Sequence, residues 1–146
     1  MTGPTALVRL ANDLDAGCSA VGELPLRDVR RTERTARVDP QTLRLVLPEA
    51  VADELGLTPA GTARVTYADG SVETRDWVRH VRLSMAERDG VYKAIVEPGP
   101  ADVVVGRLVL DDLDLFVDPV TKRCLPRDPE VMLSEIGSDA IPPTPR

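Results

Sequence analysis

The chain has 146 residues, a formal net charge of −6 and 42% hydrophobic residues, so it fits one acidic domain with apolar material for one core. Only 3% of the residues are aromatic and the 18 basic residues are scattered, which argues against a nucleic-acid-binding face. No segment is long and apolar enough to span a membrane and no secretory signal is recognisable, so we expect a cytoplasmic protein without membrane contact.

The first third of the chain is predicted to hold three strands. Apolar runs and period-two alternation place them at Thr5–Leu10, Arg34–Asp39 and Leu43–Leu47. Residues 12–31 carry glycines, a proline and many charges. They are predicted to be a long connection with a helical turn at Pro25–Arg30.

The clearest helix signal covers Pro48–Leu55. Proline stands at its first position, acidic residues follow in the first turn, and Gly56 provides a stop. Val51 and Leu55 are four residues apart and therefore share one face of the predicted helix.

Two hairpins are predicted in the middle of the chain. Strands at Thr62–Tyr67 and Ser71–Trp77 flank an Asp-Gly turn at residues 68–70. Further strands at Val78–Met85 and Val91–Val96 flank a second Asp-Gly sequence.

The last predicted elements are a strand at Val103–Val105, a helix at Arg107–Leu113 and a strand at Leu115–Val117. Beyond Pro126 the pattern fails and prolines accumulate. We expect one domain over residues 1–126 and a disordered, proline-containing tail over residues 127–146. Many short strands with one or two short helices favour an all-β barrel or sandwich.

Residues that support common catalytic and metal chemistry are scarce. Cys18 and Cys124 lie far apart, and His80 is the one histidine, so neither a zinc site nor a Ser-His or Cys-His enzyme is expected. The acids at residues 111–114 lack the glycine and distal glutamate of a calcium loop, and are interpreted as a solvated helix end. We expect no metal and no cofactor.

Five segments in order resemble the retropepsin-like aspartic proteases, in particular their small bacterial stand-alone members. These are a strand ending in an aspartate, an apolar run into proline, a short helix with its exit, a hairpin, and a Val-Val-Gly-Arg motif: Arg37-Val38-Asp39, Leu45-Val46-Leu47-Pro48, Glu49–Leu57, Tyr67–Ser71 and Val103–Arg107. The resemblance covers residues 5–126.

The resemblance implies the closed all-β barrel of the acid-protease fold and a symmetric homodimer. Each subunit would contribute Asp39, because two adjacent carboxylates can share one proton while one of them activates water. The hairpin residues Tyr67, Ala68, Asp69 and Gly70 would form the flap that binds the substrate.

The sequence departs from the family at the catalytic tripeptide. Asp39-Pro40-Gln41 stands where the family has Asp, then Thr or Ser, then Gly. Pro40 has neither a hydroxyl nor a backbone N–H, and Gln41 adds a side chain where the family needs none. We therefore expect a non-catalytic homodimeric domain that binds a peptide or a protein partner.

Two other functions remain open at this stage. The chain could be an active aspartic endopeptidase that uses Asp39 from each subunit, or a monomeric β-barrel module whose proline-rich tail docks to a partner. Asp39 could also simply end a strand and pair with Arg37, which lies on the same strand face. Trp77 stands close in sequence to Arg75 and Arg79, and three interpretations remain: a cation–π contact with these arginines, an interface anchor, or ordinary barrel packing.

Overall fold

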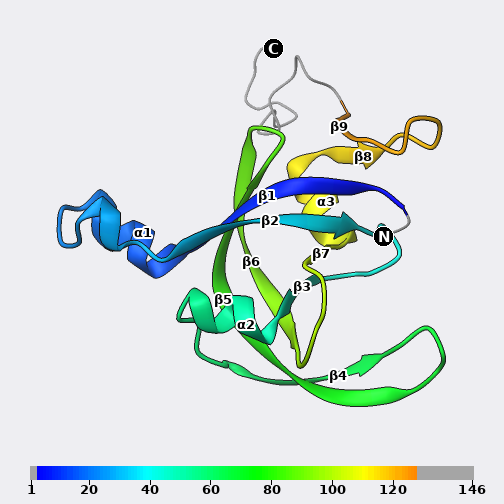
Figure 1. Ribbon diagram of the computed structural model, residues 1–146, viewed down its shortest axis with the longest axis horizontal. Coiled ribbons are helices and arrows are strands. Elements are labelled where there is room, and N and C mark those ends of the chain that lie inside the picture. The colour runs from blue at the N-terminus through cyan, green and yellow to red at the C-terminus, as the bar shows by residue number, and fades with distance from the viewer. Residues whose placement is uncertain (1–2, 128–146) are drawn as a thin grey trace, which may run out of the picture.

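The computed structural model describes residues 3–127. The α-helices of this range are α1 (Asp13–Ala20), α2 (Glu49–Glu54) and α3 (Arg107–Leu113). Its strands are β1 (Thr5–Asn12), β2 (Arg31–Val38), β3 (Leu45–Pro48), β4 (Gly61–Thr66), β5 (Val72–Met85), β6 (Arg88–Glu97), β7 (Val104–Val105), β8 (Leu115–Val117) and β9 (Cys124–Pro126). Figure 1 shows their arrangement.

Seven strands form one mixed sheet in the order β1-β2-β7-β3-β6-β5-β4, and β8 pairs with β9 in a separate ribbon. The pairs β2–β7 and β3–β6 are parallel, whereas the other pairs are antiparallel. The sheet curls far enough that β1 also pairs with β5. Among the strands of residues 3–127, β4 pairs with β5 alone, so none of these strands covers its outer edge.

The expected closed all-β barrel is therefore wrong, and the architecture is mixed α/β. Parallel pairs need crossover connections, and here the segment from β3 to β6 carries both α2 and the β4–β5 hairpin. Local alternation of apolar residues reveals strands but not which distant strands they pair with, so parallel pairing was invisible in the sequence.

The predicted elements of the central region are largely confirmed, but the second hairpin turns at Ala86-Glu87 and not at Asp89-Gly90, which lies within β6. Helix α3 has the predicted bounds, and α2 begins one residue after Pro48, which occupies the capping position. The strands predicted as Ser71–Trp77 and Val78–Met85 are one continuous strand, β5. An irregularity between Val78 and Val81, with His80 at a φ of 69°, bends this strand without ending it.

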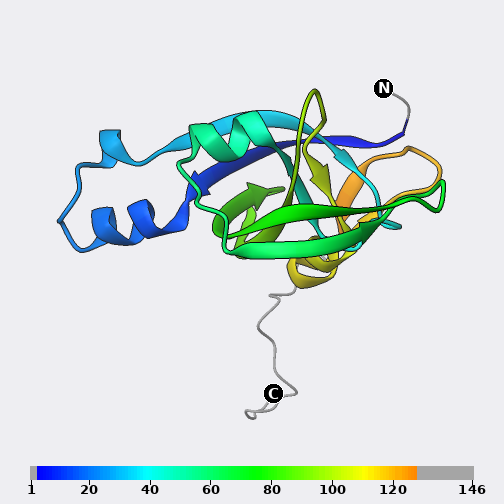
Figure 2. The same ribbon diagram turned by 90° about the horizontal axis from the view of Figure 1, so that it is seen from below.

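Helix α1 was not predicted. None of its residues is buried, so it has no apolar stripe for the sequence to reveal. Together with the following turn at Leu26–Asp28 it forms an arm that projects from the sheet (Figures 1 and 2). The predicted helical turn at residues 25–30 is this short 3-10 helix.

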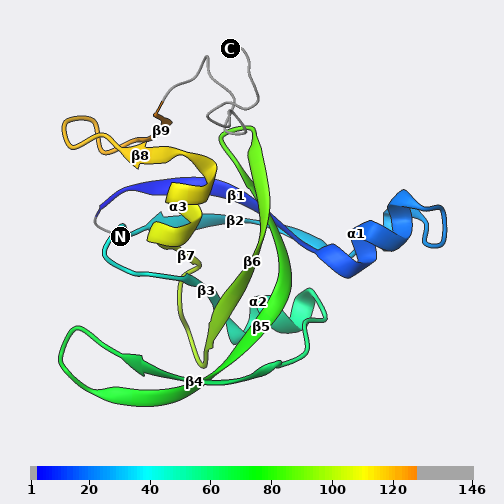
Figure 3. The same ribbon diagram turned by 180° about the vertical axis from the view of Figure 1, so that it is seen from behind.

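Aliphatic side chains build a single core, as the aromatic-poor composition requires. Leu10, Leu47, Leu83 and Val105 from four strands are almost fully buried, and so is Leu113 of α3. Helix α3 lies behind β1 and β2 in the view of Figure 1, and Figure 3 shows it from the other side. It closes that end of the core against β6 and β8.

No helix within residues 3–127 has the length and apolar character that crossing a membrane requires. The predicted disordered tail lies, except for Arg127, outside the described residues.

Candidate functional site

Asp39 follows the last residue of β2, at the start of the loop that leads to β3. Its backbone N–H donates to the carbonyl of Val105 at 3.0 Å, and its own carbonyl accepts from the N–H of Thr42 at 3.1 Å. The first bond connects the loop to β7, and the second closes a turn over residues 39–42.

Both oxygens of the Asp39 carboxylate are engaged within this loop. Oδ1 accepts from the backbone N–H of Gln41 at 3.0 Å, and Oδ2 accepts from the Thr42 hydroxyl at 2.8 Å. Arg37 Nη1 lies 3.7 Å from Oδ2, so the surface ion pair considered from the sequence is present. Asp39 therefore acts as a turn-closing acceptor, a common local role of aspartate.

The loop is hydrogen-bonded to the start of α3. The N–H of Arg107 donates to the carbonyl of Thr42 at 2.7 Å, and that of Leu108 donates to Leu43 at 3.0 Å. A Cβ on Gly106 would lie 2.4 Å from the carbonyl oxygen of Arg44, so glycine is required there by close backbone approach.

The predicted flap is a hairpin whose tip is a tight turn. Asp69 Oδ1 accepts from the backbone N–H and the hydroxyl of Ser71 at 2.9 and 2.6 Å, and these bonds lower the pKa of Asp69. Gly70 supplies the positive φ of 87° that the turn needs. Ala68 is exposed.

Tyr67 fastens the hairpin to the end of β6. Its hydroxyl pairs with a Glu97 carboxylate oxygen and accepts from Arg75 Nε at 2.9 Å, and Arg75 and Glu97 form an ion pair at 3.2 Å. Partial burial and the bond to Glu97 raise the pKa of Tyr67. Within residues 3–127, no hydrogen bond or ion pair connects the hairpin residues 67–70 to Asp39.

A second cluster surrounds Trp77, the chain's single tryptophan. Arg79 and Lys93 each lie 5.2 Å from the centre of its ring, whereas Arg75 stacks on Tyr67 at 5.6 Å. Of the three interpretations left open for Trp77, the cation–π contact is therefore present, with Arg79 and Lys93 as its cations.

The half-buried Trp77 borders a groove of about 200 Å³, which we call the Trp77 groove. Arg44, Ala63, Lys93, Ala94 and Ile95 line the rest of it. Within the described range, Arg44, Arg79 and Lys93 have no acidic partner, although the chain as a whole has net charge −6. Sequence reasoning missed this groove because its residues come from β4, β5, β6 and the approach to β3.

Other candidates have ordinary roles. Asp112 accepts from the Tyr92 hydroxyl at 2.6 Å and Asp114 pairs with Arg127 at 3.0 Å, so these acids are structural. Cys18 is exposed and Cys124 is half-buried, and both are free thiols. No group of three His, Cys, Asp or Glu side chains in the described part of the chain is placed to hold a metal ion.

The chain matches no model of a known protein family and no curated protein.

Proposed function

We propose that this protein is a non-catalytic peptide-binding domain, a degenerate relative of the retropepsin-like proteases, and that it acts as a homodimer. The observation that carries the non-catalytic part is the engagement of Asp39. Each oxygen of Asp39 accepts a hydrogen bond from its own loop and Arg37 lies 3.7 Å from Oδ2, so the position of this carboxylate after β2 is explained by a structural role without catalysis.

The Trp77 groove is the proposed binding site, and its chemistry favours an acidic, extended peptide. Among residues 3–127, Arg44, Arg79 and Lys93 have no acidic partner. Arg79 and Lys93 lie over the aromatic ring, which offers apolar area, and Arg44 lines the groove beside it. Ala63 of β4 lines the groove, and no other strand of the described range pairs with the outer edge of β4. A peptide strand added to that edge would gain main-chain hydrogen bonds and direct alternate side chains to one face.

Catalysis is tested by digesting a peptide library between about pH 4 and 7, the range in which a carboxylate dyad works. We expect no cleavage by the wild type or by Asp39→Asn. Cleavage by the wild type that is lost in Asp39→Asn would overturn the non-catalytic assignment in favour of an active endopeptidase.

Binding is tested through the fluorescence of Trp77, which reports on the groove directly because the chain has no other tryptophan. A short blocked peptide of alternating Glu and Val should change the emission, and the Lys and Val counterpart should not. Lys93→Glu should abolish the response, because it reverses one of the cations stacked on the ring.

Arg64→Glu is the matched control. Arg64 is exposed on β4 next to Ala63, but does not line the groove. An equal loss of binding in both variants would contradict the site and indicate attraction by overall charge. Light scattering tests the dimer, and a monomer at all concentrations would favour a monomeric interaction module.

A further inference from the structure

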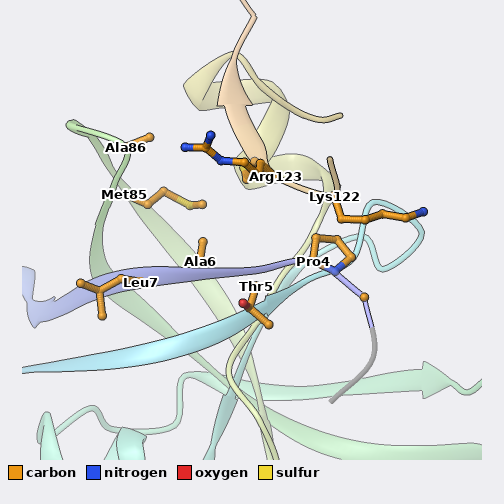
Figure 4. Close-up of a pocket in the computed structure, with 10 residues that line it drawn as sticks. Pro4, Thr5, Ala6, Leu7, Met85, Ala86, Lys122 and Arg123 are labelled. Carbon is orange, nitrogen blue, oxygen red and sulfur yellow. The ribbon is translucent and has the colours of Figure 1, made fainter. Parts of the chain in front are cut away.

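A second pocket, of about 390 Å³, opens where strands β1 and β5 cease to pair. Their antiparallel ladder ends at the pair Arg9–Ser84, and from Val8 back to Thr5 the strand β1 pairs only with β2 among the described strands. Three segments enclose the space beyond the last pair: Gly3–Leu7, Met85 with Ala86, and Lys122–Cys124 (Figure 4). None of these residues lines the Trp77 groove, so the two sites are separate.

Much of the lining is apolar and borders the core. Met85 belongs to the core cluster, and Ala6 and the half-buried Cys124 pack against that cluster. Leu7 also lines the pocket, although it is 58% exposed. An apolar chain that entered the pocket would remove part of this surface from water, which is favourable.

Two cations belong to the same pocket but do not converge. Figure 4 shows the Arg123 side chain directed towards the side formed by Met85 and Ala86, whereas Lys122 points away from it. Asp118 shapes the turn that presents both, because its carbonyl accepts from the N–H of Lys122 at 2.8 Å and its N–H donates to the carbonyl of Arg123 at 2.8 Å. Among residues 3–127, neither cation has an acidic partner.

This combination selects a class of ligand. The volume falls in the range of about 300–1,000 Å³ that is typical of small-molecule pockets. A guanidinium can donate two parallel hydrogen bonds to one carboxylate. Because Lys122 points away, a single cation is available to the head group, and its charge matches a monoanion better than a phosphate dianion.

We propose that this pocket binds a small carboxylate with an unbranched apolar chain, of the size of a medium-chain fatty acid. Arg123 pairs with the carboxylate, and the chain lies against Ala6, Leu7 and Met85, beside Cys124. The inference does not depend on the function proposed for the Trp77 groove.

Octanoate is the probe, and the protein carries its own reporter. Cys124 lines the pocket, and the exposed Cys18 on the α1 arm serves as the internal reference. In the full chain, the rates at which iodoacetamide alkylates both thiols are measured by mass spectrometry. Octanoate should slow the alkylation of Cys124 saturably and leave Cys18 and the emission of Trp77 unchanged. Octylamine, which has the same chain and the opposite charge, should not protect Cys124.

The chain and the head group are tested separately. Shortening the ligand from octanoate to hexanoate should weaken binding about fourfold for each CH₂ removed, the effect of burying one methylene. Arg123→Gln should weaken octanoate binding about tenfold, because a charge-assisted hydrogen-bonding partner is lost. Lys122→Gln is the matched control, since it removes the same charge from a neighbouring side chain that points away, and should change the affinity less than about twofold.

Several results would overturn the proposal. Octanoate that gives no saturable protection of Cys124 would show that the pocket does not bind this class. Equal losses in Arg123→Gln and Lys122→Gln would indicate attraction by overall charge. A response of Trp77 without protection of Cys124 would place the ligand in the Trp77 groove instead. Octyl phosphate that binds more tightly than octanoate would identify a phosphate site and contradict the carboxylate assignment.

Discussion

The Thr42 hydroxyl donates a 2.8 Å hydrogen bond to Oδ2 of Asp39, three residues earlier in the same loop. With the bond from the Gln41 N–H to Oδ1, it makes this carboxylate the element that holds the β2–β3 loop in shape. The residue expected at a catalytic position therefore has a role that stability measurements can detect.

Asp39→Ala should lower the free energy of unfolding by about 1–2 kcal/mol, because two hydrogen bonds to a partly exposed carboxylate are lost. Asp39→Asn should cost less, since its amide oxygen can still accept one of them. Urea denaturation measures both. Asp76→Ala, at an exposed position of β5, is the control and should stay within about 0.5 kcal/mol of the wild type. Equal effects of Asp39→Ala and Asp76→Ala would contradict the structural role.

Gly106→Ala should be among the most damaging small substitutions, at about 2–3 kcal/mol. The added Cβ would lie 2.4 Å from the Arg44 carbonyl and 2.6 Å from that of Thr42, and backbone atoms cannot move aside as a side chain can. Gly17→Ala is the matched control, because a Cβ there meets nothing within 4 Å and alanine favours helix α1 by about 0.5–1 kcal/mol. The midpoint temperature of thermal unfolding should fall for Gly106→Ala and rise for Gly17→Ala.

The attachment of the α1 arm depends on Asn12, which is 4% exposed. Its Nδ2 donates to the carbonyl of Leu55 at 2.9 Å, and its Oδ1 accepts from the N–H of Asp15 at 3.1 Å as the helix cap. Asn12→Ala should cost about 2–3 kcal/mol, from the lost cap and a buried carbonyl without its donor. Hydrogen exchange in residues 13–20 should rise more than in β6, and a uniform rise would contradict a local attachment.

Asp15 makes the same arm sensitive to acid. Hydrogen bonds from Arg30 lower the pKa of Asp15 below 3.8. The charged form is therefore favoured by folding, and its contribution is present above the unfolded pKa and is lost as the pH falls through the lower folded pKa. Below pH 4, the urea midpoint of unfolding should fall less steeply with decreasing pH in Asp15→Asn than in the wild type. An unchanged slope in Asp15→Asn would contradict this contribution.

The two tyrosines should make the free energy of unfolding fall as the pH rises, whereas Asp15 makes it fall as the pH drops. Burial is the first cause that raises the pKa of Tyr67 and of Tyr92, followed by the carboxylates of Glu97 and Asp112. Folding therefore favours their neutral forms, and this contribution is complete below the unfolded pKa near 10 and is lost as the pH rises towards the folded values.

Absorbance at the tyrosinate band checks this directly. In the folded protein the tyrosinate absorbance should appear at higher pH than in urea, where it should appear near the ordinary tyrosine pKa of about 10. Tyr67→Phe and Tyr92→Phe should each remove one tyrosine from this shifted titration. A folded-state titration identical to that in urea would contradict the contacts of both hydroxyl groups.

Local sequence signals determined much of the element pattern. Pro48 and Gly56 bracket α2 because proline suits the start of a helix and the backbone of Gly56 has a φ of 67°. Asp69-Gly70 marks the hairpin for a similar local reason. The position of Asp39 after a strand was also visible, because alternation ends there.

Only the tertiary structure decided how these elements join and which side chains meet. The parallel pairs β2–β7 and β3–β6 unite segments far apart in the chain, and they turn an expected barrel into a mixed sheet. Arg44, Trp77 and Lys93 meet for the same reason, since strand register places them side by side. Residue order encodes backbone preference over a few positions, whereas pairing and charge environment depend on contacts across the whole chain. Asp39 shows both kinds of determinant: its carboxylate accepts from Gln41 and Thr42, two and three residues later, whereas the bond from its N–H to the carbonyl of Val105 in β7 exists only in the folded sheet.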